Sequence, residues 1–149
     1  MKAWTGAWLG GCAIALVAAS ATAFACKGYQ ENETVEIPTL DSKRLARLLR
    51  SEKPPFVLDA NGVATRAKYG VIPGARLLSH YADYSVAKEL PPTRDSALVF
   101  YCGGKRCNAA EKSARKALKS GYENVSVLVG GITGWSESGQ VTEPLKPQS

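Results

Sequence analysis

The sequence predicts an α/β domain with a small parallel sheet and helices on both of its faces. Short apolar runs at 56–58, 97–101 and 125–129 alternate with segments whose apolar residues recur at helical spacing. Unbroken apolar runs are typical of strands that a parallel sheet buries on both faces. Their alternation with helices favours crossover connections within one sheet. The 149 residues, 45% of them hydrophobic, suit one domain with one core.

The first 25 residues are predicted to form a secretory signal peptide. No charged residue occurs from Ala3 to Cys26, Lys2 precedes the apolar run, and the run ends in Ala23-Phe24-Ala25. We therefore expect export to a bacterial periplasm, where disulfides are permitted. Membrane association is expected only if this segment is retained or Cys26 is lipidated. Residues 26–34 are then a linker, 35–140 a domain and 141–149 a flexible tail.

The first half of the domain is predicted to contain two helices and two strands. Asp41 is placed to cap a helix that turns Leu45, Leu48 and Leu49 to one face, and Pro54-Pro55 ends it. The run 56–58 is a buried strand that ends at Asp59, itself expected to cap a helix or loop. A short helix at 63–69 and a second strand at 75–78 follow.

The second half repeats this alternation around a glycine-rich loop. The strand at 97–101 ends at Cys102, residues 103–107 form a loop, and a helix runs from Ala110 to Gly121. A strand at 125–129 and a short helix around Trp135 complete the domain. Trp135 is expected to pack in the core, and His80 to lie in a surface loop.

Cys102 is the residue to which the sequence assigns chemistry. It stands at the carboxyl end of a buried strand, where sites form in open α/β sheets. The loop Gly103-Gly104-Lys105-Arg106-Cys107 is expected to turn backbone N–H groups inward, and its glycines leave room for them. With the helix dipole and the two cations, this predicts a pKa for Cys102 below the usual ~8.5. Such a thiolate can attack an electron-poor sulfur and hold it as a persulfide.

The cysteines and the net charge also allow a disulfide, a metal site or a nucleic-acid partner to be considered. Cys102 and Cys107 are close enough in sequence to form a structural disulfide in an oxidising compartment. A zinc site falls short of four ligands, since only these two cysteines and the distant His80 are at hand, and we expect neither a metal nor a cofactor. The net charge of +6 comes from basic residues scattered over helices, so no nucleic-acid partner is expected.

Four segments in order resemble the rhodanese-like sulfurtransferases, over roughly residues 40–139. They are Val57-Leu58-Asp59-Ala60, then Gly70-Val71-Ile72-Pro73-Gly74-Ala75, then Val99-Phe100-Tyr101-Cys102 with its loop, and finally Gly121-Tyr122-Glu123-Asn124-Val125 with Gly130-Gly131-Ile132-Thr133-Gly134-Trp135. The resemblance implies a parallel sheet of about five strands and transfer of sulfane sulfur through a persulfide. It makes Cys102 the nucleophile and residues 103–107 its cradle. The loop length matches sulfurtransferases, whereas the related phosphatases have one residue more.

The chain departs from the family pattern at three places. Val71 takes the place of the family's His, Cys107 that of the Arg that ends the loop, and Asn61 that of an Arg after the strand-end Asp. Losing two bidentate guanidinium donors weakens binding of a dianion, so efficient thiosulfate-to-cyanide transfer is not expected. The expected partners are a small sulfur donor (thiosulfate, polysulfide or persulfide) and a thiol acceptor, and a monomer is expected.

Two alternatives to the sulfurtransferase remain open on the sequence. One is a periplasmic thiol–disulfide switch that uses Cys102 and Cys107. The other is a catalytically inactive rhodanese-like binding module whose cysteine pair is a permanent bond.

Overall fold

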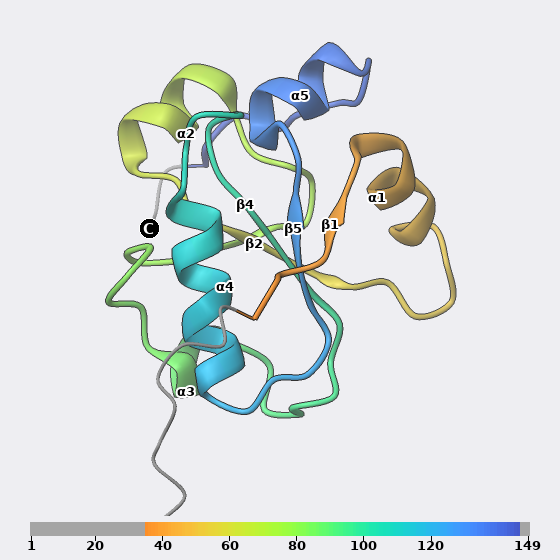
Figure 1. Ribbon diagram of the computed structural model, residues 1–149. Coiled ribbons are helices and arrows are strands. Elements are labelled where there is room, and N and C mark those ends of the chain that lie inside the picture. The colour runs from red at the N-terminus through yellow and green to blue at the C-terminus, as the bar shows by residue number, and fades with distance from the viewer. Residues whose placement is uncertain (1–34, 147–149) are drawn as a thin grey trace, which may run out of the picture. The chain divides into compact units, whose positions relative to one another are not determined.

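The computed structural model describes residues 35–146 (Figure 1). The predictions of a signal peptide and a linker, and that of lipidation at Cys26, lie outside these residues. No helix in the described part is long and apolar enough to cross a membrane. In chain order the elements are β1 (Thr39–Leu40), α1 (Ser42–Leu48), β2 (Phe56–Asp59), α2 (Val63–Tyr69), β3 (Arg76–Leu77), α3 (Val86–Glu89), β4 (Leu98–Tyr101), α4 (Ala109–Lys119), β5 (Val125–Leu128) and α5 (Gly131–Glu137).

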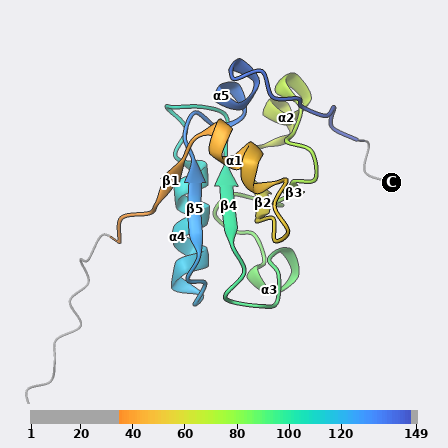
Figure 2. The same cartoon turned by 90° about the vertical axis from the view of Figure 1, so that its right-hand side faces the viewer.

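The five strands form one parallel sheet in the order β1-β5-β4-β2-β3. The predicted fold class is therefore confirmed. The central strand β4 pairs with β2 through Leu58 and Phe100 and with β5 through Phe100 and Val127. Because all strands run the same way, their carboxyl ends meet at one edge, where Figure 2 shows α2 and α5. Cys102 follows β4 at this edge, in the middle of the sheet.

Helices cover both faces of the sheet and bury two separate apolar clusters. Figures 1 and 2 show α4 on one face and α1 on the other. Leu58, Leu98 and Phe100 pack on the face covered by α4. Val57, Val99 and Tyr101 point to the opposite face, where they pack with Leu45, Ile132 and Trp135. Alternation along strands that are buried on both sides produces the unbroken apolar runs of the sequence.

The capped helix α1 confirms one prediction and corrects another. The Asp41 carboxylate accepts a hydrogen bond of 2.7 Å from the Arg44 backbone N–H, so Asp41 is the N-cap. Leu45 is fully buried as expected, but Leu48 is 38% exposed and Ala46 takes the inward position beside Leu45. Leu48 is the last residue of the helix. The helical spacing from Leu45 to Leu48 therefore does not decide whether the Leu48 side chain faces the sheet.

Two short elements were not predicted from the residues. Strand β1 is only two residues long, and helix α3 is a single turn in a polar, proline-containing stretch. Neither length allows a periodic pattern to develop. The strand exists because the Val127 and Val129 N–H groups of the β5 segment donate to Pro38 and Leu40, a contact between residues far apart in the chain.

Residues that were expected to begin a flexible tail pair with the domain. Val71 and Glu143 exchange two backbone hydrogen bonds of 2.8 Å in an antiparallel bridge. The Trp135 indole N–H donates to the Val141 carbonyl at 2.8 Å. The carbonyl of Glu143 lies 2.5 Å from where a Cβ on Gly70 would sit, so the segment lies close against the end of α2. Contacts of the domain thus continue beyond residue 140.

Candidate functional site

The predicted loop lies between the central strand and the helix α4, at the carboxyl edge of the sheet. Strand β4 ends at Tyr101, the loop occupies residues 102–107, and α4 begins at Ala109 with Asn108 as its N-cap (Figure 1). Within the loop, the Cys107 N–H donates to the Gly104 carbonyl at 2.9 Å. The structure thus places all six predicted site residues, Cys102 through Cys107, around one turn.

The first turn of α5 fixes the start of this loop. The N–H of Ile132 donates to the Cys102 carbonyl at 2.8 Å, and that of Thr133 to the Gly103 carbonyl at 3.2 Å. Gly131 has a φ of +56°, and a Cβ there would sit 2.1 Å from the Cys102 carbonyl oxygen. Glycine is therefore required at 131, for both its backbone conformation and the close approach. The sequence pattern Gly130-Gly131 marks this contact.

The two thiols of the loop differ in access. Both are free in this structure; Cys102 is 3% exposed, whereas Cys107 is exposed. The Cys102 thiol donates to the Cys107 carbonyl, with 3.1 Å between sulfur and oxygen. It also hydrogen-bonds to the Cys107 sulfur. The loop therefore holds one buried thiol as a donor and one exposed sulfur as its neighbour.

The environment of Cys102 does not lower its pKa, contrary to the prediction. Burial raises the pKa of the thiol from the ordinary 9.0 to about 11, and the hydrogen bond to Cys107 adds to the rise. The N–H groups of Ala110 and Gly104 act in the opposite direction without balancing these effects. The prediction counted donors and positive charge but omitted the loss of solvent around a buried sulfur.

Cys107 receives the stabilisation that the sequence assigned to Cys102. Burial works against its ionisation, but the bond from the Cys102 thiol and the N–H groups of Ala109, Gly103 and Gly104 lower the pKa of the Cys107 thiol. The loop amides thus surround both sulfurs, and the hydrogen bond between the thiols favours negative charge on Cys107. The sequence placed Cys102 at the end of a buried strand and Cys107 in the loop, but the prediction did not include the effect of this burial on the pKa of Cys102.

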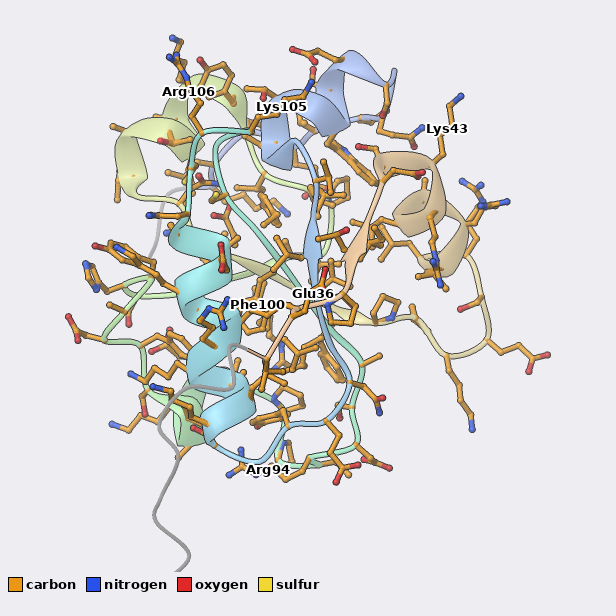
Figure 3. All side chains as sticks on the ribbon, viewed as in Figure 1. Glu36, Lys43, Arg94, Phe100, Lys105 and Arg106 are labelled. Atoms are coloured by element: carbon orange, nitrogen blue, oxygen red, sulfur yellow. The ribbon has the colours of Figure 1, made fainter. Side chains whose placement is uncertain are left out.

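Lys105 and Arg106 are not among the main groups that set the pKa of Cys102. Both side chains are exposed, and the largest shifts of the two thiols come from burial, from each other and from backbone N–H groups. Figure 3 shows the Arg106 side chain extending outward from the end of the molecule where the loop lies. Their charges therefore border the loop and leave its interior to the backbone N–H groups.

Two pockets adjoin the loop. The larger is an open pocket of about 570 Å³, and the smaller is a cavity of about 210 Å³. Cys107 lines both, whereas Cys102 lines only the smaller. The larger pocket is lined by Thr65, Tyr69, Gly103, Gly104, Lys105, Arg106, Cys107, Gly130, Thr133, Gly134 and Glu137. A small molecule thus has a path to Cys107 that Cys102 does not share.

A buried polar network lies beside the loop, at the end of the neighbouring strand β2. Asp59 is fully buried and accepts hydrogen bonds of 2.6 Å from the Tyr101 hydroxyl and from the Asn61 N–H, so it caps the loop after β2 as predicted. Arg66, 6% exposed, donates to the Asp59 and Leu78 carbonyls at 3.0 and 2.9 Å. Its Nε lies 3.4 Å from Asp59 Oδ1, an ion-pair contact without hydrogen-bond geometry.

Sequence reasoning missed the role of Arg66. A buried strand-end carboxylate needs a charged partner, and the predicted helix 63–69 carries Arg66 on a side that faces the sheet. The pairing of this carboxylate with an arginine on the next helix could have been predicted from the sequence.

Asn61 was singled out only as a replacement for an Arg. Its side-chain oxygen lies 3.7 Å from where a Cβ on Gly103 would sit, so it borders the loop. Its Nδ2 is buried and makes no hydrogen bond within the described residues.

The predictions for Trp135 and His80 are confirmed. Trp135, a residue of α5, is buried in the core, and His80 is an exposed residue whose Nδ1 lies 3.2 Å from Asp83 Oδ2. Val71, in the place of the family's His, is buried and takes part in the bridge to Glu143.

Comparison with known proteins agrees with this architecture. A protein of Bacillus halodurans has 23% sequence identity and a TM-score of 0.61, with 72% of this chain and 77% of that chain covered. The rhodanese-like domain of an Anabaena protein has 23% identity and a TM-score of 0.61, with coverage of 74% and 81%. SseA from Escherichia coli, a 3-mercaptopyruvate sulfotransferase, has 21% identity and a TM-score of 0.59, with coverage of 76% and 53%.

Sequence comparison decides the family. None of the curated proteins matches the chain. The family model of the rhodanese-like domain, however, matches residues 41–138, which include every element from α1 to α5 and the whole cysteine loop. The chain therefore belongs to the rhodanese-like domain family.

Proposed function

We propose that this protein is an exported sulfurtransferase that carries sulfane sulfur as a persulfide on Cys102. The observation that supports it most is the position of this sulfur. It lies at the carboxyl end of the central strand, with the N–H groups of Gly104 and Ala110 directed to it. Family membership and the likeness to a sulfotransferase support the same reaction class. Export rests on the sequence of the first 25 residues alone.

The chemistry that this site supports is a balanced exchange of sulfur. In charging, a thiosulfate dianion and the Cys102 thiol give the Cys102 persulfide anion and hydrogen sulfite. The sulfur–sulfur bond of the donor breaks, its electron pair leaves with the sulfite, and the thiol proton goes with it. In discharge, an acceptor thiolate attacks the outer sulfur, and Cys102 leaves as the thiolate. The donor and acceptor are substrates, and no step changes the net oxidation state.

The loop contributes to this exchange in two ways. Its N–H groups provide fixed donors for an anionic sulfur without any reorganisation during the reaction. The cavity of about 210 Å³ beside Cys102 is the space into which a second sulfur can extend. Because Lys105 and Arg106 are exposed and Asn61 lacks a guanidinium, we expect weak selection for thiosulfate over polysulfide.

Intact-protein mass spectrometry tests the proposal. The reduced wild-type chain is incubated with thiosulfate or with inorganic polysulfide, desalted and weighed. We expect a gain of one sulfur atom, which Cys102→Ala loses and Lys119→Gln, an exposed change near the far end of α4, retains. A reduced chain with an intact Cys102 that gains no sulfur from any of several donors would contradict the proposal.

A thiol–disulfide switch is a second candidate, favoured by the contact between two free thiols in one loop. It requires an external oxidant that accepts two electrons as the disulfide forms. The switch predicts a reversible midpoint potential for the Cys102–Cys107 pair and complete loss of activity in Cys107→Ser. The sulfurtransferase predicts that Cys107→Ser still holds a persulfide on Cys102.

A further inference from the structure

The two thiols of the loop differ in their exposure to solvent and in the pockets that they line. Cys107 is exposed and lines the open pocket of about 570 Å³. Cys102 is 3% exposed and lines only the smaller cavity of about 210 Å³, which it shares with Cys107. A donor in the open pocket therefore meets Cys107 and not Cys102, and both cysteines line the smaller cavity.

The hydrogen bonds around the two sulfurs also favour Cys107 as the more reactive thiol. The Cys102 thiol donates its proton to the Cys107 carbonyl at 3.1 Å and to the Cys107 sulfur. The N–H groups of Gly103, Gly104 and Ala109 point to the Cys107 sulfur. These contacts stabilise a thiolate at Cys107 and a protonated thiol at Cys102. The pKa of Cys102 rises to about 11 while that of Cys107 falls below the ordinary 9.0, in agreement with the geometry.

We propose that Cys107 is the entry thiol of this loop: its thiolate takes the sulfane sulfur from an anionic donor in the open pocket and passes it inward to Cys102. This inference rests on the proposed function, in which the sulfur finally resides on Cys102, and it adds a second catalytic residue and an order of events. The donor class is a small sulfane-sulfur anion, because Lys105, Arg106 and the loop amides surround the pocket, although Glu137 contributes one negative charge to it.

Each step is balanced without an added oxidant or reductant. With thiosulfate, the Cys107 thiolate bonds to the outer sulfur, the sulfur–sulfur bond of thiosulfate breaks, and sulfite leaves with the electron pair. In the second step, the Cys102 proton moves to the outer sulfur of the Cys107 persulfide. The Cys102 thiolate then attacks that sulfur, and Cys107 leaves as a thiolate. The products are a Cys102 persulfide and the original Cys107 thiolate.

The size of the expected effect follows from thiol chemistry. Because the pKa of Cys102 is raised and that of Cys107 is lowered, Cys102 has the smaller thiolate fraction near neutral pH. Each pKa unit of difference reduces that fraction about tenfold, and the higher intrinsic nucleophilicity of Cys102 recovers about half of the loss on a logarithmic scale. Loading of Cys102 without Cys107 is therefore expected to be at least about tenfold slower, and burial of Cys102 slows it further.

Rapid-quench mass spectrometry on the full chain tests the order of events. Wild type, Cys107→Ser and Cys102→Ser are mixed with inorganic polysulfide, quenched with an alkylating agent and digested with trypsin. Cleavage after Lys105 and Arg106 places the two cysteines on different peptides. We expect Cys107→Ser to load Cys102 at least about tenfold more slowly than wild type does, and Cys102→Ser to load Cys107 at the wild-type rate.

Several outcomes would overturn the relay. One is a Cys107→Ser variant that loads Cys102 as fast as wild type. Another is a wild-type time course in which Cys102 gains sulfur before Cys107, a measurement that needs no folded variant. A third is formation of a Cys102–Cys107 disulfide with release of one sulfide, in place of the Cys102 persulfide. If wild type never carries sulfur on Cys102 while Cys107 does, the proposed function itself fails, which the peptide assignment distinguishes.

Discussion

The neighbouring strands β2 and β4 each end at a buried polar side chain, Asp59 and Cys102, but the surroundings of these two side chains differ. At the end of β2, Asp59 is fully buried and surrounded by the Arg66 guanidinium, the Tyr101 hydroxyl and a backbone N–H. At the end of β4, Cys102 is surrounded by backbone donors and by a second thiol that opens to a pocket. The first arrangement satisfies a charge permanently, whereas the second leaves room for a sulfur to arrive and leave.

Burial has different consequences at the two ends. It is compensated at Asp59, where charged and polar side chains replace water. It is not compensated at Cys102, so the pKa of that thiol rises. We therefore expect the Asp59 network to stabilise the fold beside the loop, and we assign the proposed sulfur chemistry to the cysteine loop.

The largest effect on stability is expected from Arg66→Met. Removing the guanidinium leaves the Asp59 carboxylate and two carbonyls buried without their partner, which costs about 3–5 kcal/mol of unfolding free energy. Urea unfolding monitored by tryptophan fluorescence measures it. The matched control is Lys68→Met, an exposed change on the same helix that should stay within about 0.5 kcal/mol. A loss below about 1 kcal/mol at Arg66 would show that the network is not structural.

Gly131→Ala is expected to lower the stability less than Arg66→Met does, but to displace the cysteine loop directly. The new Cβ would meet the Cys102 carbonyl oxygen, so the loop must shift. Gly121→Ala is the control, because Gly121 also has a positive φ, +87°, but open space around its Cβ position. Both variants bear the left-handed backbone cost, and Gly131→Ala should lose about 1–3 kcal/mol more from the clash.

Sulfur loading separates these two glycine variants further. We expect Gly131→Ala to lose most of its capacity for sulfur and Gly121→Ala to keep it. Equal loading and equal unfolding free energies in the two variants would show that the contact between Gly131 and the Cys102 carbonyl does not hold the loop in place.

The smallest effect is expected from the loop cations. Alkylation of a thiol rises with pH as the thiolate forms, so Cys107 should react with a midpoint below pH 9 and Cys102 with a midpoint near pH 11. In Lys105→Gln/Arg106→Gln the Cys102 midpoint should move by no more than about half a pH unit, since exposed charges contribute little. A rise of a full pH unit or more would restore these cations to the role that the sequence predicted.

Much of the fold could be predicted from local sequence patterns. Helix α2 has the predicted bounds, β4 and β5 lie within the predicted runs, and β2 extends the run 56–58 by Asp59, because their apolar patterns and turn residues are local. The site loop was located for the same reason, since a strand end followed by Gly103-Gly104 is visible in the sequence. The number of strands came from the family resemblance, because β1 alone has too few residues for a pattern.

The features that the sequence did not predict depend on contacts between residues that are distant in the chain. Arg66 meets Asp59 only after α2 folds back on the sheet, and Glu143 meets Val71 across most of the domain. The pKa order of Cys102 and Cys107 depends on the burial and the hydrogen-bond donors of each sulfur in the folded loop. Such properties follow from packing rather than from local composition.

Single-turnover transfer tests the central claim, that the cysteine loop carries a transferable sulfur on Cys102, most directly. Wild type is charged with polysulfide, freed of excess donor and mixed with a small thiol acceptor, and the sulfur on the acceptor and the mass of the Cys102 peptide are measured together. We expect one sulfur per chain to reach the acceptor while Cys102 returns to the free thiol. A charged chain that keeps its sulfur, or that yields a Cys102–Cys107 disulfide and no persulfide on the acceptor, would contradict the account.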